Sequence, residues 1–79
     1  MRVLFFAHLK EAAGCARMEL RLAAPTDADG VWRSVISVHP RLALFRDSVR
    51  LARNGAYAAP DAVFDNADEV ALIPPVSGG

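Results

Sequence analysis

The feature that limits the fold most is a single helical segment of useful length, residues 26–39, with strand-like segments on both sides of it. Apolar residues recur along this segment at helical spacing and give it one apolar face. Thr26 or Asp27 is expected to cap its first turn, and Pro40 disfavours helix just beyond it. One helix must bury its apolar face against other elements, and the flanking strands supply a sheet.

Strand patterns occur on both sides of the helix. Residues 3–7 are a continuous apolar run, which predicts a central strand buried on both faces. Residues 18–22 and 49–53 alternate, as half-buried strands do, and Asn54-Gly55 is a strong turn signal. Residues 69–73 predict a last strand, placed beside the first. We therefore expect an α+β fold, with a mixed sheet of four to five strands packed on one main helix.

Some core positions follow from the same patterns. Trp32 lies on the apolar face of the helix, so a core role is favoured over ligand binding. Gly30 is expected to weaken the first helical turn by about 1 kcal/mol relative to alanine. Leu42, Leu44 and Phe45 are expected to close the bottom of the core from an irregular segment.

Composition narrows the classes of function. Nine Lys plus Arg balance nine Asp plus Glu, which argues against binding nucleic acid or a membrane surface. The single Cys15 excludes an internal disulfide and is typical of a reducing compartment, so we expect a cytoplasmic protein. His8 and His39 have no metal-ligand spacing with Cys15, and no metal is expected. A hydrophobic fraction of 53% in 79 residues predicts an exposed apolar patch for a partner.

The last six residues carry the most informative chemistry, and they read Pro74, Pro75, Val76, Ser77, Gly78 and Gly79. The prolines lack the amide hydrogens of a strand and favour an extended chain, so we expect a domain over residues 1–73 and a flexible tail over 74–79. The tail would reach roughly 20 Å and end in an unhindered carboxylate. Activating that carboxylate needs a separate ATP-using enzyme, because this chain holds no recognisable catalytic set. Di-glycine ends also occur by chance.

Several segments resemble the small subunits of molybdopterin synthase, which are ubiquitin-like sulfur carriers with the β-grasp fold. Residues 3–14 resemble the opening strand and turn of that family, with Lys10 where arginine is usual. Residues 66–68 replace the family's Asp-Gly-Asp turn. The specific match is over residues 68–79, where the strand, the proline pair and the terminal di-glycine occur together. The resemblance covers essentially the whole chain.

The resemblance implies a cycle centred on Gly79. A ubiquitin-activating-type adenylating enzyme would use ATP to form an acyl-adenylate on Gly79, and a sulfurtransferase system would convert it into a thiocarboxylate. The large subunit of molybdopterin synthase would receive the tail within a heterotetramer. Sulfur would pass there to cyclic pyranopterin monophosphate during molybdenum cofactor biosynthesis, and no cofactor would be bound by this chain. The implied partner-binding residues are Leu72, Ile73, Pro74, Pro75, Val76, Ser77 and Gly78, with Leu72 and Ile73 as exposed apolar contacts.

Three other functions stay open at this point. The chain could carry sulfur for thiamine or cysteine biosynthesis. It could be a ubiquitin-like modifier that is conjugated to lysines through Gly79. It could also be a β-grasp binding module with an inert tail. A self-sufficient enzyme is the least favoured reading, because no side chains form a catalytic set of their own.

Overall fold

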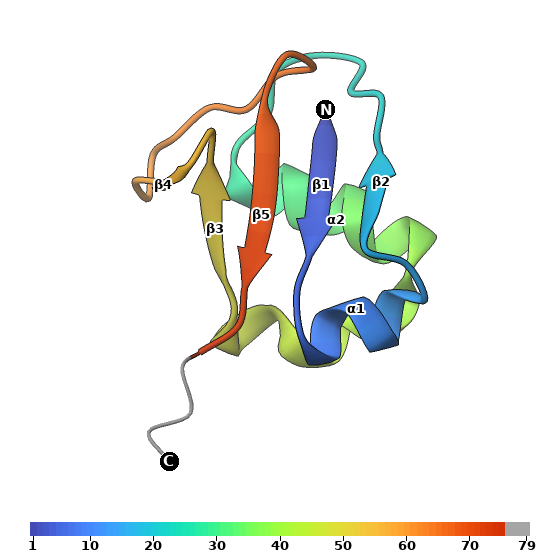
Figure 1. Cartoon of the computed structure of the whole chain (residues 1–79). Helices are drawn as coiled ribbons and strands as arrows, with labels where there is room; N and C mark the ends of the chain where they lie inside the picture. The colour runs from blue at the N-terminus through green and yellow to red at the C-terminus, as the bar shows by residue number, and fades with distance from the viewer. Residues whose placement is uncertain (76–79) are drawn as a thin grey trace.

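A five-stranded mixed sheet with one long helix laid across one of its faces forms the body of the protein (Figure 1). The computed structural model describes residues 1–75. Its elements are β1 (Arg2–Phe5), α1 (His8–Ala13), β2 (Arg17–Glu19), α2 (Ala28–Val38), the 3₁₀ helix η1 (Pro40–Ser48), β3 (Arg50–Arg53), β4 (Ala56–Tyr57) and β5 (Glu69–Ile73). The predicted α+β architecture is confirmed.

The first and last strands lie side by side in the sheet, in the order β2-β1-β5-β3-β4. β1 and β5 are parallel, with Val3 opposite Val70 and Phe5 opposite Leu72. The other neighbouring strands are antiparallel. All the other elements lie between β1 and β5 in the sequence, and α2 lies in the crossover that carries the chain from β2 to β3, on opposite sides of this parallel pair. The prediction that the last strand lies beside the first is confirmed.

Local sequence signals set both ends of α2. The Asp27 side chain accepts a hydrogen bond from the Gly30 amide at 2.9 Å and so caps the first turn. The helix ends at Val38, two residues before Pro40, as predicted. Gly30 also has a packing role, because a Cβ on it would lie 1.8 Å from Thr26 Oγ1. The glycine lets the entering chain pass close against the helix.

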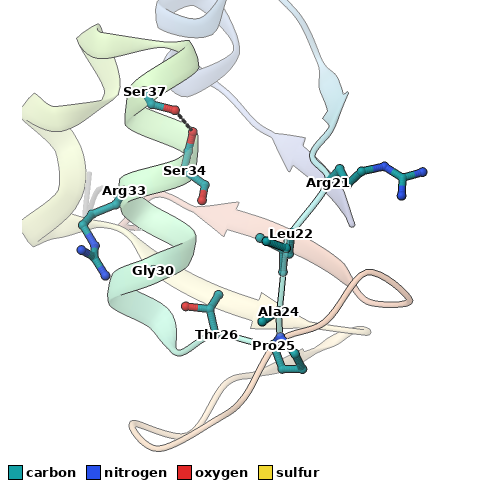
Figure 2. Close-up of a pocket in the computed structure, with 10 residues that line it drawn as sticks. Arg21, Leu22, Ala24, Pro25, Thr26, Gly30, Arg33, Ser34 and Ser37 are labelled. Atoms are coloured by element: carbon teal, nitrogen blue, oxygen red, sulfur yellow. Dashed lines mark hydrogen bonds between the residues drawn. The ribbon is translucent and has the colours of Figure 1, made fainter.

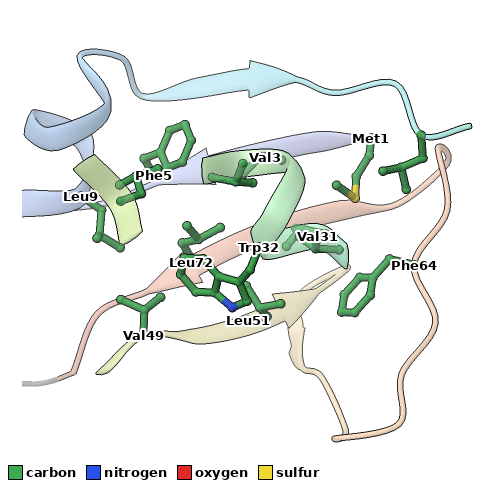
Figure 3. Packing of buried hydrophobic residues seen from close by; sticks show 14 residues of the cluster. Met1, Val3, Phe5, Leu9, Val31, Trp32, Val49, Leu51, Phe64 and Leu72 are labelled. Atoms are coloured by element: carbon green, nitrogen blue, oxygen red, sulfur yellow. The ribbon is translucent and has the colours of Figure 1, made fainter. Parts of the chain in front are cut away.

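The core lies between α2 and the face of the sheet that α2 covers (Figure 3). Trp32 is only 5% exposed, so its predicted core role is confirmed. The side chains with no exposed surface include Val3, Leu9, Val31, Val35, Leu42, Phe64, Val70 and Leu72. These residues come from strands, helices and loops, and they form one cluster rather than two.

The prediction that residues 3–7 form a strand buried on both faces is wrong. α2 covers one face of the sheet and leaves the other open (Figure 1). Val3 and Phe5 point into the core, whereas Leu4 is half-buried and Phe6 is 45% exposed. The apolar run therefore places side chains on the open face as well as in the core.

The prediction for residues 42–45 is correct only in part. The segment is a regular 3₁₀ helix, η1, rather than irregular. Leu42 is fully buried and Phe45 packs against the core, but Leu44 is 84% exposed. In a 3₁₀ helix residues three apart lie on the same side, so Leu42 and Phe45 share the inner side and Leu44 does not.

The predicted strand over residues 18–22 is shorter in the structure, because β2 ends at Glu19. Beyond it, the Asn66 side chain takes the place of a neighbouring strand. Asn66 Oδ1 accepts from the Leu22 amide at 2.7 Å, and Asn66 Nδ2 donates to the Leu22 carbonyl at 2.9 Å. Both backbone groups of the buried Leu22 are therefore satisfied without a sheet ladder.

Candidate functional site: the tail root and the open face of the sheet

The C-terminal tail starts from the interior of the sheet. β5 is paired on both sides, with β1 as far as Leu72 and with β3 as far as its last residue, Ile73. Pro74 is half-buried and Pro75 is exposed. We call Ile73, Pro74 and Pro75 the tail root. The end of the strand coincides with the predicted boundary at residue 73, and the division into domain and tail stays a prediction.

The predicted partner-binding residues differ in how far they are exposed. Leu72 has no exposed surface, because its side chain points into the core beneath α2. Its prediction as an exposed contact is therefore wrong, since strand side chains alternate and Ile73 takes the open side. Ile73 is half-buried on the open face. Val76, Ser77, Gly78 and Gly79 lie outside the described residues.

Apolar side chains gather on the open face next to the tail root. The pairing register places Leu4 beside Ala71, while Phe6 follows Leu4 on the same side. Tyr57, on β4, and Ile73 line one hollow. We call Leu4, Phe6, Tyr57, Ala71 and Ile73 the open-face patch. Phe6 and Tyr57, at opposite sides of this patch, are 45% and 57% exposed, so both present large apolar surfaces on the open face.

Charge is distributed unevenly along the open face. At the end far from the tail root, Arg2 lies 3.3 Å from Glu19 and 3.7 Å from Glu69, measured between nitrogen and oxygen. Near the tail root the charged side chains are basic. The guanidinium carbon of Arg50 lies 4.2 Å from the ring centroid of Tyr57, and Arg17 lines a hollow with Leu4 and Phe6. In residues 1–75, no acidic side chain lines either hollow of the open-face patch.

A second surface, between α2 and residues 21–26, lacks the features of a binding site. It is a hollow of about 460 Å³ (Figure 2). Its two basic side chains, Arg21 and Arg33, point away from it. Arg33 Nε instead lies 3.0 Å from Asp29 Oδ2. Hydrogen bonding to Arg46, followed by the charge of Arg33, lowers the pKa of Asp29 below its ordinary value. These charges stabilise the helix surface and do not converge on a ligand.

Cys15, His8 and His39 were not predicted to form a metal site. The fold brings Cys15 Sγ to 3.9 Å from His39 Nε2, a proximity that the sequence did not indicate. The His39 ring packs edge-on against Phe5, and His8 packs against Phe45. Within the described residues, no group of three or more His, Cys, Asp or Glu side chains is arranged to hold a metal. Nor does any helix of this part of the chain have the length and apolarity to cross a membrane.

The sequence did not identify Phe6 and Tyr57 as residues of the open-face patch, or Arg50 as the basic residue beside Tyr57. The alternation of β5 carries the signal that could have found them. If Val70 and Leu72 point inwards, Ala71 and Ile73 must point outwards, and so must their neighbours across the sheet.

The sheet order, the single crossover helix and the tail root define a ubiquitin-like protein with the β-grasp fold. The sequence profile described as the ThiS family matches residues 3–79, and the chain belongs to that family. It is 32% identical over 79 residues to the molybdopterin synthase sulfur carrier subunit of Arabidopsis thaliana, covering 100% of this chain and 82% of that protein. It is 30% identical over 82 residues to the human molybdopterin synthase sulfur carrier subunit, covering 100% and 93%.

Solved structures show the same fold. The crystal structure of SAMP1 from Haloferax volcanii superposes with a TM-score of 0.85 at 31% identity, covering 100% of this chain and 98% of that one. The likeness therefore extends over the sheet, α2 and the tail root together.

Proposed function

We propose that this chain is the sulfur-carrier subunit of a molybdopterin synthase, and that Gly79 carries the sulfur. The observation that carries the proposal is the full-length likeness to sulfur carrier subunits, together with a tail that leaves a central strand beside an exposed apolar patch. A thiol that is free in the described structure, Cys15, is compatible with the reducing cytoplasm that we propose as its location.

The proposed chemistry takes place at the terminal carboxylate. An adenylating enzyme joins the Gly79 carboxylate to AMP from ATP, and pyrophosphate leaves. A sulfurtransferase system supplies a sulfur nucleophile that displaces AMP, which leaves a thiocarboxylate. The large subunit then receives the tail, and the sulfur passes to cyclic pyranopterin monophosphate. Gly78 leaves room for the chain end in a narrow channel, while Val76 and Ser77 line the route.

We propose that the open-face patch is where this chain docks on the large subunit and on the adenylating enzyme. The two most exposed large side chains of the patch, Phe6 and Tyr57, would be covered in the complex. The tail root lies at the edge of the patch, so docking there aims the tail at the partner. Residues 74–79 can extend roughly 20 Å, enough to reach into a buried active site.

The decisive experiment is the intact mass of the full chain after incubation with the adenylating enzyme, MgATP and a sulfur donor. We expect a mass gain equal to one oxygen replaced by one sulfur, mapped to Gly79. The matched control is the chain that lacks only Gly79, which should keep its fold and gain nothing. If the enzyme thiocarboxylates a known carrier but leaves this chain unchanged, the proposal fails.

A second candidate, a protein modifier, is favoured by the likeness to SAMP1, the small archaeal modifier protein 1 of Haloferax volcanii. That function requires isopeptide bonds between Gly79 and lysines of other proteins. The same incubation in a host extract separates the two readings. Lysine-linked adducts without sulfur transfer to cyclic pyranopterin monophosphate would support the modifier. Sulfur transfer without adducts would support the carrier.

A further inference from the structure

The basic side chains of this protein are almost all arginines. Of nine Lys plus Arg residues, Lys10 is the only lysine in the sequence. A guanidinium stays protonated under ordinary conditions, so it has no free electron pair with which to attack an acyl group. Lys10 is therefore the one side-chain amine in this sequence that can accept an acyl group.

The other amine, that of Met1, is held in the sheet. It donates a hydrogen bond to the Leu20 carbonyl at 2.7 Å, and Met1 is only 5% exposed because its side chain belongs to the core. For this amine to attack, the hydrogen bond must break and the end of β1 must leave its place. Lys10, in contrast, is exposed on α1.

The surroundings of Lys10 suit an activated tail. Lys10 lines a hollow of about 550 Å³ together with Leu4, Phe6 and Arg17. Within residues 1–75, Arg17 forms no ion pair within 4.0 Å. An acyl-adenylate carries a phosphate anion, which two neighbouring cations attract. The apolar side chains of the hollow would accommodate an extended tail such as Pro74-Pro75-Val76.

We infer that Lys10 is the acylation site of this chain, where the activated Gly79 of a second copy is joined through an isopeptide bond. The inference rests on the proposed activation of Gly79. The neutral ε-amine attacks the acyl carbon, the bond between that carbon and the adenylate oxygen breaks, and AMP leaves with the electron pair. The ammonium proton passes to solvent. The reaction needs no oxidant or reductant, and it competes with the sulfur nucleophile for the same intermediate.

The adduct has a consequence for the acceptor copy. A chain attached at Lys10 occupies the hollow that Leu4 and Phe6 line, and these two residues belong to the open-face patch. The modified copy would therefore be hindered from docking. Self-acylation would withdraw carrier from the cycle when sulfur is scarce.

The test uses the full chain with the adenylating enzyme and MgATP, with the sulfur donor omitted. Pyrophosphate release and the acyl-adenylate mass are measured first, because they report the proposed activation alone. The expected product is a dimer whose mass is two chains less one water, with Gly79 mapped to Lys10 by proteolysis. Lys10→Arg is expected to abolish this dimer when the yield is normalised to the acyl-adenylate formed.

Two double variants test whether the hollow matters and not only the presence of a lysine. Lys10→Arg with Arg17→Lys returns an amine to the same hollow and is expected to restore the dimer. Lys10→Arg with Arg21→Lys places the amine on the other surface, where Arg21 points away into solvent (Figure 2), and is expected not to restore it.

The possible outcomes distinguish the proposed activation of Gly79 from the inferred acylation of Lys10. Absence of both pyrophosphate release and the acyl-adenylate mass would overturn the proposed activation and the Lys10 inference with it. Pyrophosphate release with no dimer, or with a dimer that persists in Lys10→Arg through the Met1 amine, would overturn the Lys10 inference alone. An equal yield from the Arg21→Lys double variant would overturn the role of the hollow. Adding the sulfur donor to wild type should suppress the dimer.

Discussion

The Asn54 side-chain amide donates a hydrogen bond to Asp68 Oδ1 at 2.9 Å and links two turns that are far apart in sequence. Asn54 has a positive φ in the turn between β3 and β4, and its Oδ1 accepts from the Glu69 amide at 2.9 Å. The turn before β5 is thus attached to the β3–β4 turn at the end of the sheet opposite the tail root. This contact helps to hold in register the strand from which the tail extends.

Asp68 gives a prediction about pH. A hydrogen bond from the Asp65 amide, and then one from Asn54, lowers the pKa of Asp68 below its ordinary value of 3.8. Because the folded-state pKa is the lower one, the carboxylate stabilises the fold above about pH 4, and this contribution is lost as the pH falls below 3.8 through the folded value.

We therefore expect Asp68→Asn to lower stability at pH 7 and to flatten the acid side of the stability profile. Urea denaturation between pH 2 and 7 would measure the free energy of unfolding of this variant. Asp61→Asn, at an exposed aspartate, is the control. An unchanged slope below pH 4 would argue against this role of Asp68.

Asn66 gives a prediction about stability. Asn66→Ala leaves the amide and the carbonyl of buried Leu22 without their partner, at a cost of about 1–3 kcal/mol in the free energy of unfolding. Asn66→Asp keeps the acceptor for the Leu22 amide and loses the donor, so an intermediate loss is expected. If the two variants are as stable as wild type in urea denaturation, water replaces the side chain without cost.

Leu72 and Ile73 are adjacent, yet their substitution should have different effects. Leu72→Ala removes a fully buried side chain, and we expect the free energy of unfolding to fall by about 2–5 kcal/mol. Ile73→Ala, on the half-buried open face, should cost clearly less. Chemical denaturation of both variants decides the matter, and equal losses would contradict the placement of Ile73 outside the core.

Ile73 also tests the proposed docking surface. Ile73→Asp places a charge in the open-face patch, and we expect the affinity for the large subunit to fall by about tenfold or more. The matched control is Val38→Asp, since Val38 is 50% exposed on α2, on the other side of the sheet. Calorimetric titration measures both. Comparable losses in the two variants, or none in either, would remove the patch from the interface.

For Gly30→Ala we predict a change in stability opposite to the one that helix propensity alone would give. Alanine in place of glycine would normally stabilise a helix by about 1 kcal/mol. Here the new Cβ would lie 1.8 Å from Thr26 Oγ1, so we expect Gly30→Ala to lower the melting temperature. Adding Thr26→Gly removes the obstructing side chain and should recover part of the loss. A more stable Gly30→Ala variant would show that Thr26 moves aside easily.

Much of the fold was readable from the sequence, because its signals are local. The Asp27 cap, the stop before Pro40 and the positive-φ turn at Asn54-Gly55 each depend on a few neighbouring residues, and the structure has all of them. The closing strand and the proline pair are likewise local patterns. They were sufficient to place the tail root at the end of β5.

Which apolar side chains face a partner could not be read in this way. Residues 3–7 are apolar in both phases of the strand alternation, and in residues 69–73 only Glu69 distinguishes the two phases, so the sequence alone does not fix which phase faces the helix. That choice follows from α2 packing on one face of the sheet, a contact between residues distant in sequence. It buries Leu72 and leaves Ile73, Phe6 and Tyr57 on the open face, where Lys10 shares one hollow with Phe6.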